Sequence, residues 1–318
     1  MAAQRQGSTI PVLVVLSVVV VFWYAMAVHM NGPWQRTLNE RAGVTEIDVT
    51  GFARQTWAQD KPMLPVPHQI VSEAFGAAGS AIGACLSTEG ADIGTRIGCV
   101  WQSLGDQFTS RRSLFYHAWI TLSATLAGFA LGTVLGIGLA VVIVYNDASN
   151  RSLMPWIIAS QTIPILAVAP MVVVGLGAVG ITGLVPKSLI SMYLSFFPVV
   201  VGMVKGLRSP EAILLDLLRT YDATPWQVFA KLRWPASMPF LFAAMKVGIA
   251  ISLIGAVVGE LSNAAGGGLG VRLLTGSYNG QTIQIWAALL LAATLAAVLV
   301  VAVGAAERLV NARMGVRA

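Results

Sequence analysis

Long stretches almost free of charged residues alternate with polar segments along this chain. A helix needs about 20 apolar residues to cross a bilayer core, and six stretches approach or exceed that length. The first is too long for a signal-peptide core and lacks a small-residue cleavage site, so we interpret it as an anchor helix. The third is uncharged to residue 186, but its glycines predict a helix end near Val179. The predicted spans are 10–28, 118–145, 153–179, 188–204, 235–259 and 282–306.

The composition agrees with this pattern. Of the 318 residues, 56% are hydrophobic and only 11% are charged, and the mean hydropathy is +0.74. Soluble domains have roughly 45–50% apolar and about 25% charged residues. A water-soluble core could not bury this much apolar surface, so we predict an all-α integral membrane protein with about six transmembrane helices.

The lysines and arginines predict the orientation of these spans. Six crossings place both termini on one side, and basic residues favour cytoplasmic segments. With both termini in the cytoplasm, the two short outer loops carry only Lys187 and Arg272. The cytoplasmic segments then carry Arg5, Arg151, Lys205, Arg208, Arg219, Lys231, Arg233, Arg308, Arg313 and Arg317.

The net charge of +6 includes no basic cluster interleaved with aromatic residues, so we expect no nucleic-acid partner.

Four regions follow from this topology: an N-terminal anchor helix (1–30), an external segment (31–114), a core of five transmembrane helices (115–310) and a cytoplasmic tail (311–318). Residues 31–67 end in "KPMLPVP", and each proline disfavours helix for its predecessor. We therefore expect extended or irregular backbone there.

The second part of the external segment predicts an amphipathic helix. This helix would lie on the outer membrane surface or pack on the protein itself. Cys85 and Cys99 belong to the same segment and are either two small apolar residues or a disulfide, which requires an oxidising compartment. His29, His68 and His117 are scattered, so no metal site is expected. The apolar positions of the predicted amphipathic helix are Ile93, Ile97, Val100, Trp101, Leu104 and Phe108.

Between the fourth and fifth spans stands a polar stretch, "DLLRTYDATPWQVFAKLRWP" (216–235). Asp222 tolerates a turn, Thr224 can cap a helix, and Pro225 suits a first helical position. The stretch therefore predicts helix, turn, helix. Trp226 and Phe229 on a charged segment indicate a partner with a groove.

The spacing of this stretch resembles a motif in the permease subunits of bacterial ATP-binding cassette (ABC) importers. That motif is Glu-Ala-Ala, three residues, Gly, nine residues, Ile, one residue, Leu-Pro. Asp222 takes the glycine place, and Leu217 and Leu218 are bulkier than the alanines they replace, which leaves the docking geometry open. The matching residues are Asp216, Leu217, Leu218, Asp222, Leu232, Trp234 and Pro235.

Other segments, including "LPVPHQIVSEAF", "QTIPILAVAPMVVVGLG" and "VVGELSNAAGGGLG", resemble the branch of these permeases that handles nitrate, sulfonates, taurine and thiamine-precursor pyrimidines. The resemblance covers roughly residues 64–308. "QTIP" before a hydrophobic run is closer to permeases for pyrimidines or flavin-like solutes.

The resemblance implies a type I ABC importer permease of the bacterial cytoplasmic (inner) membrane, with a cytoplasmic coupling helix that docks in an ATPase cleft. Trp226 and Phe229 would be the docking anchors, and Pro235 would form the hinge into the fifth span. The implied partners are an ATPase dimer that uses ATP and Mg²⁺, a second permease (an identical copy or a close paralogue), a periplasmic or lipid-anchored substrate-binding protein, and membrane lipid.

Some polar or helix-distorting residues in the spans are candidates for a solute path, although ordinary packing is an alternative for each. Lys246 is expected to snorkel or pair rather than touch solute. Gly128, Gly132, Gly136 and Gly138 would allow close helix packing. The candidates for lining the solute path are Gln161, Pro164, Pro170, Ser195 and Glu260.

The chain has no Gly-x4-Gly-Lys-Ser/Thr loop for nucleotide phosphates, so it is not expected to hydrolyse ATP or to bind a cofactor itself. We assign no catalytic residue and no metal ligand. The alternatives to an importer permease are an ion-coupled secondary transporter, which would show paired interrupted helices, and an intramembrane enzyme. No paired carboxylates or Ser–His set supports the latter.

Overall fold

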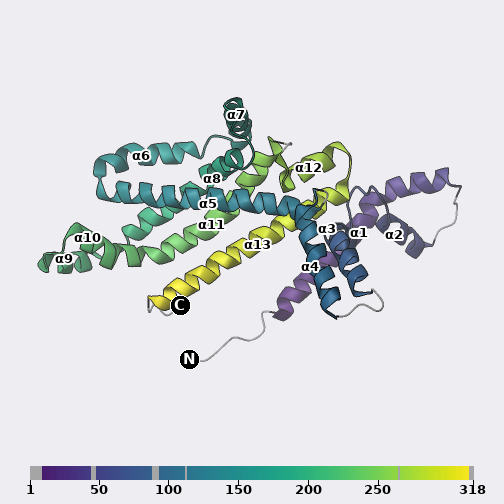
Figure 1. The fold of residues 1–318 in the computed structure, drawn as a ribbon, viewed down its shortest axis with the longest axis horizontal. Helices are drawn as coiled ribbons and strands as arrows, with labels where there is room; N and C mark the ends of the chain where they lie inside the picture. Colours follow the sequence, from purple (N-terminus) through teal and green to yellow (C-terminus); the bar gives the residue numbers. More distant parts are fainter. Residues whose placement is uncertain (1–8, 44–47, 88–92, 112, 264–265, 315–318) are drawn as a thin grey trace. The chain divides into compact units, whose positions relative to one another are not determined.

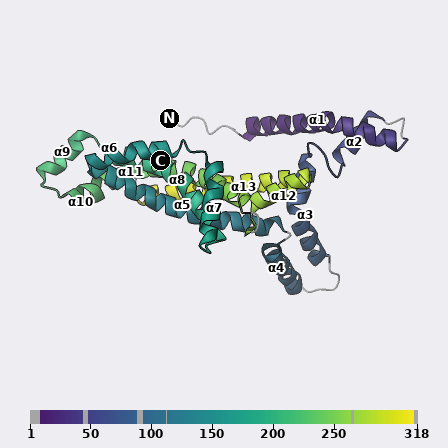
Figure 2. The same ribbon diagram turned by 90° about the horizontal axis from the view of Figure 1, so that it is seen from above.

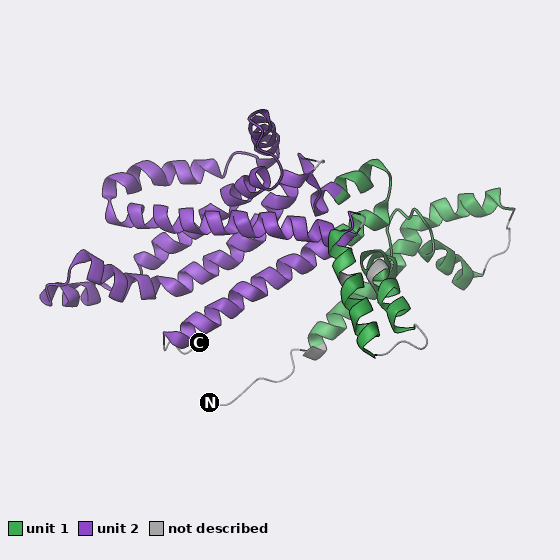
Figure 3. Cartoon of the chain, in the orientation of Figure 1, with its two compact units in different colours: residues 1–109, 272–290 green, residues 110–271, 291–318 purple. Residues whose placement is uncertain are grey.

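A computed structural model describes residues 9–43, 48–87, 93–111, 113–263 and 266–314, which are helical wherever they are regular. The chain divides into two compact units (Figure 3). Unit 1 comprises Met1–Thr109 and Arg272–Leu290, and unit 2 comprises Ser110–Val271 and Leu291–Ala318. The expected all-α fold is confirmed.

Unit 2 is built around three long helices, α5, α8 and α11, which lie side by side (Figures 1 and 2). Helix α12 begins in unit 2 and continues in unit 1, and α13 runs from unit 1 into unit 2. The helices from α5 onward are α5 (Leu114–Tyr145), α6 (Asp147–Ser160), α7 (Ile165–Ala178), α8 (Leu184–Leu207), α9 (Ala212–Thr220), α10 (Pro225–Val228), the π-helical turn η1 (Phe229–Arg233), α11 (Trp234–Leu261), α12 (Leu269–Tyr278) and α13 (Thr282–Arg313).

Glycines on α5 let its backbone approach α8 closely. A Cβ atom added to Gly128 would overlap Ser191, and one added to Gly136 would lie 2.8 Å from Val199. Gly132 faces Ser195 in the same way. The expected packing role is therefore confirmed for these three glycines but not for Gly138, whose added Cβ would meet nothing within 4 Å.

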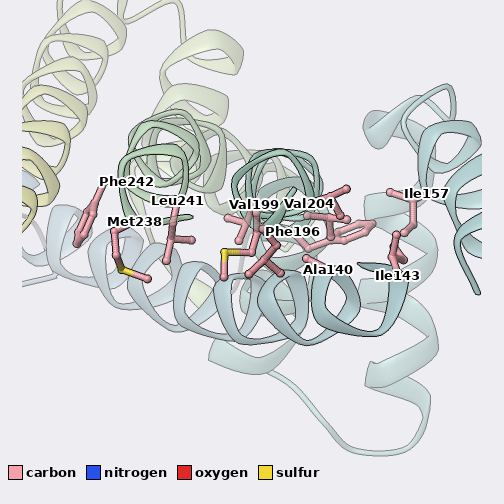
Figure 4. Close-up of a cluster of buried hydrophobic side chains, with 12 residues drawn as sticks. Ala140, Ile143, Ile157, Phe196, Val199, Val204, Met238, Leu241 and Phe242 are labelled. Carbon is pink, nitrogen blue, oxygen red and sulfur yellow. The ribbon is translucent and has the colours of Figure 1, made fainter. Parts of the chain in front are cut away.

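Buried apolar side chains pack together between α5, α8 and α11 (Figure 4). Ile157 of α6 joins this cluster, so the helix after α5 is held by the same core. The buried members are Ala140, Ile143, Ile157, Phe196, Val199, Val200, Met203, Val204, Leu207, Met238, Leu241 and Phe242.

Five helices of the described chain are long and apolar enough to cross a membrane on their own. The third predicted span is broken: α6 and α7 are inclined by 96° across a gap of four residues. The expectation of one continuous third span is wrong. The break ends with Pro164, which lacks an N–H and disfavours helix at Ile163. The predicted helix end is right, since α7 ends at Ala178.

In unit 1, the first helix is longer than expected. Helix α1 (Thr9–Arg41) passes through Pro33, and α2 (Val49–Trp57) follows. The expectation of irregular backbone is thus wrong for 31–41 and 49–57, although it holds for 58–66. Tertiary contacts explain the difference: the Asn31 side chain donates to the carbonyls of Thr56 and Leu64 and accepts from the Leu64 N–H.

A helical hairpin completes the N-terminal part of unit 1. Helices α3 (Pro67–Leu86) and α4 (Ile93–Thr109) are joined by a disulfide between Cys85 and Cys99, with the two Cα atoms 5.7 Å apart. The structure therefore favours the disulfide over two independent thiols.

The contrast between Gly128 and Gly138 gives a direct test of the helix packing. Gly128→Ala should force α5 away from α8, because overpacking a close contact costs typically about 1–3 kcal/mol. Gly138→Ala should be neutral or slightly stabilising, because alanine favours helix and the site has room. Thermal unfolding of the two purified variants in detergent measures the difference. Equal unfolding temperatures would contradict the packing described.

Candidate functional sites at the two ends of helix α11

The connection between α8 and α11 folds as two short helices around a tight turn, at one end of unit 2 (Figures 1 and 2). Asp222 adopts a left-handed conformation with φ of 49°. The Ala223 N–H donates to the Leu218 carbonyl at 3.1 Å, and the Asp222 N–H donates to that of Arg219 at 3.0 Å. This pair of hydrogen bonds is a Schellman motif, in which glycine is the usual left-handed residue. Asp222 thus occupies the glycine place in conformation as well as in spacing.

The second short helix begins with the cap predicted from its sequence. The Thr224 side chain accepts from the Gln227 N–H at 3.4 Å, and the Gln227 side chain accepts from the Thr224 N–H at 2.9 Å. Pro225 is the first residue of α10. An N–H at this position has no partner within the helix, so proline, which lacks an N–H, costs no hydrogen bond there. This reciprocal capping box fixes where Trp226 projects.

The helical backbone runs from this segment into α11 without a gap, so the structure shows no break at Pro235, and the hinge there stays a prediction. Arg233 and Trp234 have helical backbone angles, and the Trp234 N–H donates to the carbonyl of Phe229 across a π-helical turn. A proline ring clashes with the carbonyl four residues earlier, and a wider turn relieves such a clash. The helical path therefore continues from Pro225 to Leu261.

The loop leaves several large apolar side chains in the open. Tyr221 is 76% exposed and Trp226 is 72% exposed, and Ile213, Leu214 and Leu217 are also exposed. Together these five residues form what we call the loop patch. The charged pair Asp216–Arg219, at 2.9 Å, lies beside them and is itself exposed.

The remaining predicted loop residues contribute less to this open surface. Leu218 and Leu232 are half-buried, and Pro235 is exposed at the start of α11. Phe229 is half-buried as well, with its ring centroid 5.7 Å from that of Trp234 and 6.1 Å from that of Tyr145. Phe229 therefore helps to attach the loop to its own protein, and Trp226, stacked on it at 5.5 Å, is the outward-facing aromatic of the pair.

At the other end of α11, Glu260 is fully buried. The Thr121 hydroxyl of α5 lies 2.8 Å from one carboxylate oxygen, and the Gly270 N–H donates to the other at 2.8 Å. The same hydroxyl accepts from the Leu269 N–H at 2.9 Å. The carboxylate is thus enclosed by protein donors and does not lie at a solvated boundary.

Two further side chains hold the glycine-rich segment 266–270 beside Glu260. Lys187, which was expected in an outer loop, lies buried in the first turn of α8 and donates to the carbonyls of Gly266 and Gly267. His117 of α5 accepts the Gly268 N–H on Nδ1, so its Nε2–H donates to the Arg111 carbonyl. Residues from α5, α8 and α11 therefore bind one short backbone segment, and we call this group the Glu260 cluster.

The cluster leaves no room for a side chain at Gly268 or Gly270. A Cβ added to Gly268 would overlap the Glu260 carboxylate, and one added to Gly270 would lie 2.5 Å from the Val257 carbonyl. Gly267 and Gly268 also have positive φ. The run of glycines is therefore a steric requirement for closing this backbone over the carboxylate.

The other predicted path residues do not come together with Glu260. Gln161 caps the end of α6, and Pro164 is exposed at the break before α7. Pro170 is exposed within α7. Ser195 is fully buried between α8 and α5, where its hydroxyl faces the carbonyls of Met192 and Gly128. Their place on a solute path stays a prediction.

Lys246, in the middle of α11, is paired as expected. Its ammonium lies 2.5 Å from the carboxylate of Glu307 on α13. The sequence did not indicate this partner, nor the roles of Thr121, Lys187 and His117. His117 and Thr121 stand four residues apart on one helical face, which is the only local signal, and Thr121 lies 139 positions from Glu260.

Comparison with known proteins shows which family has this sequence pattern. Residues 132–316, more than half of the chain, match the family described as "Binding-protein-dependent transport system inner membrane component". The chain belongs to this family. Both the α8–α11 loop and Glu260 lie inside the matched region, whereas α1–α4 precede it.

The chain is also similar to individual permeases. The chain is 30% identical over 184 residues (58% of its length, 73% of the relative) to a probable ABC transporter permease protein of Haemophilus influenzae. It is 32% identical over 213 residues (67% and 75%) to the riboflavin transport system permease protein RibX of Chloroflexus aurantiacus. It is 35% identical over 149 residues (46% and 58%) to the formylaminopyrimidine transport permease protein ThiX of Halalkalibacterium halodurans. The protein is therefore an ABC transporter permease subunit.

Removing the carboxylate of this permease's Glu260 cluster should loosen segment 266–270. Glu260→Ala leaves the Gly270 N–H without its acceptor in a buried site, which costs about 1–3 kcal/mol. Hydrogen exchange of the peptide covering 266–270 should accelerate in the variant. Glu211→Ala is the matched control, because Glu211 is exposed and its side chain makes no cap hydrogen bond. Unchanged exchange in Glu260→Ala would show that the carboxylate does not hold the segment.

Proposed function

We propose that this permease forms half of the membrane channel of an ATP-driven importer and couples to a partner ATPase through the loop patch. The observation that carries the proposal is the patch itself: five exposed apolar side chains on a short, capped loop that also bears charged residues. Such a patch is typical of a protein interface. ATP and Mg²⁺ belong to the ATPase, in keeping with the absence of a phosphate-binding loop in this sequence.

The continuous helix gives this loop a mechanical role. Pro225–Leu261 contains 37 residues, so at 1.5 Å per residue it is roughly 55 Å long. The capped loop occupies one end and the Glu260 cluster the other. A push from the ATPase on α10 would be carried along this rod, because the helix is unbroken, and would move Glu260 relative to its partners on α5 and α8. We propose that this displacement opens and closes the outer side of the channel in alternating access.

The disulfide supports the proposed orientation. Cys85 and Cys99 can remain bonded in the periplasm but not in a reducing cytoplasm. With α3 and α4 outside, the three crossings made by α5, the α6–α7 pair and α8 place the loop patch in the cytoplasm. Both termini are then cytoplasmic, and the protein resides in the bacterial inner membrane.

The partners follow from the same proposal. A second permease, an identical copy or a close paralogue, completes the channel, and an ATPase dimer binds the two cytoplasmic loops. A periplasmic or lipid-anchored binding protein delivers the solute.

For the solute we propose a small heteroaromatic molecule, because two of the relatives at 30% identity or more are named for formylaminopyrimidine and riboflavin. A relative named for aliphatic sulfonates, from Bacillus subtilis, is less similar at 26%. The ligand bound by the cognate binding protein decides between these classes.

Trp226→Ala should release the ATPase, because a buried aromatic anchor at an interface is worth about 2 kcal/mol or more. Tyr278→Ala is the matched control: Tyr278 is 82% exposed and lies on α12, at the opposite side in the proposed topology. The two variants should reach the same membrane abundance, and only Trp226→Ala should lose ATPase copurification and transport. Phe229 is kept intact because its ring also packs against Tyr145. Full ATPase recovery and transport with Trp226→Ala would refute the docking role.

The orientation can be tested with single cysteines at two exposed positions, Arg54→Cys on α2 and Thr220→Cys on α9. The native cysteines are bonded and need not be removed. A membrane-impermeant thiol reagent applied to intact spheroplasts should label Arg54→Cys, and should label Thr220→Cys only after permeabilisation. Labelling of both from outside would exclude the proposed topology.

A further inference from the structure

Helix α4 carries an apolar stripe that the rest of unit 1 does not cover. Ile93 is 73% exposed, Trp101 is 71% exposed, and Ile97 between them is 53% exposed. These residues recur every fourth position, so they lie on one face of the helix. We call them the α4 stripe. This part of the chain precedes the region that matches the permease family.

The disulfide determines which way this stripe faces. Cys99 bonds to Cys85 of α3, and at 100° per residue it lies on the opposite side of α4 from Ile97 and Trp101. The covalent bond therefore holds the polar side of α4 toward its hairpin partner and turns the stripe outward. A reversed packing, with the stripe buried against α3, would break the bond.

The chain length keeps α4 close to the membrane. Helix α5, with 32 residues, is about 48 Å long, little more than the 40–45 Å of a bilayer with its headgroups. Its first residue, Leu114, must therefore lie near a membrane surface. Only four residues separate Leu114 from Thr109, the last residue of α4, so their Cα atoms can be at most about 18 Å apart.

We propose that the α3–α4 hairpin lies on the membrane and inserts the α4 stripe into the boundary between lipid headgroups and acyl chains. Tryptophan is enriched at this depth, and amphipathic helices bury their apolar face there. A protein partner fits less well, because a stable interface needs 20–30 residues a side. The stripe is a narrow row, with the exposed Gly98 beside Trp101 and the exposed polar residues Thr95 and Gln102 on the other side of the helix.

A photo-crosslinking pair tests the proposal on the full-length permease. Benzoylphenylalanine replaces Trp101 in one variant and Asp106 in the other; both positions are exposed on α4, and Asp106 lies on the face opposite the stripe. Both proteins are reconstituted in vesicles of phosphatidylethanolamine and phosphatidylglycerol, after a gel with and without reductant establishes that the disulfide is retained. Mass spectrometry of the irradiated α4 peptide then identifies the adducts.

The proposal expects lipid adducts at position 101 at a several-fold higher yield than at position 106. Three results would overturn it: a crosslink from position 101 to a second copy of the chain, equal lipid yields at the two positions, or no lipid adduct at position 101. The same irradiation of the complex with its ATPase and binding protein can give a fourth result that would overturn the proposal. A crosslink from position 101 to either partner would show that protein, and not lipid, covers the α4 stripe.

Discussion

The close contact of α8 with α5 and α11 is the constraint on which the rest of the permease depends. Apolar helices gain no hydrophobic free energy by leaving lipid for one another, so their association relies on close packing and hydrogen bonds. The side chain of Ser191 on α8 donates to the Ser252 carbonyl of α11, and the side chain of Ser252 donates to the Thr125 carbonyl of α5. This relay is possible only because glycines such as Gly128 and Gly255 bring the backbones together.

Once these three helices are joined, both candidate sites are fixed at their ends. The α8–α11 loop connects two members of the packed group, and its position is secured where Phe229 meets Tyr145 of the third. The Glu260 cluster draws one side chain or more from each of the same three helices. A displacement of α11 relative to α5 and α8 must therefore disturb both ends, which is the physical reason for treating the loop and the cluster as parts of one device.

The N-terminal part of unit 1 is built on a different principle. There, polar contacts and a covalent bond replace the glycine packing of unit 2: Asn31 is bound to the backbone near residues 56 and 64, and Cys85 is bonded to Cys99. These helices expose much of their apolar surface within the unit. Such a segment depends on cross-links and on its surroundings for a fixed conformation, since it has little core of its own.

The sequence by itself determined the membrane class, the helical fold, the family and the local chemistry of the loop, including the turn at Asp222 and the cap at Thr224. These follow from hydropathy and from interactions within a few residues. Only the tertiary structure decided that Glu260 is buried with Thr121 and Lys187, and that the helix continues through Pro235 without a break. Partners more than a hundred residues apart leave no periodic signal in one sequence. Whether a proline bends a helix depends on the turn that the surrounding packing allows.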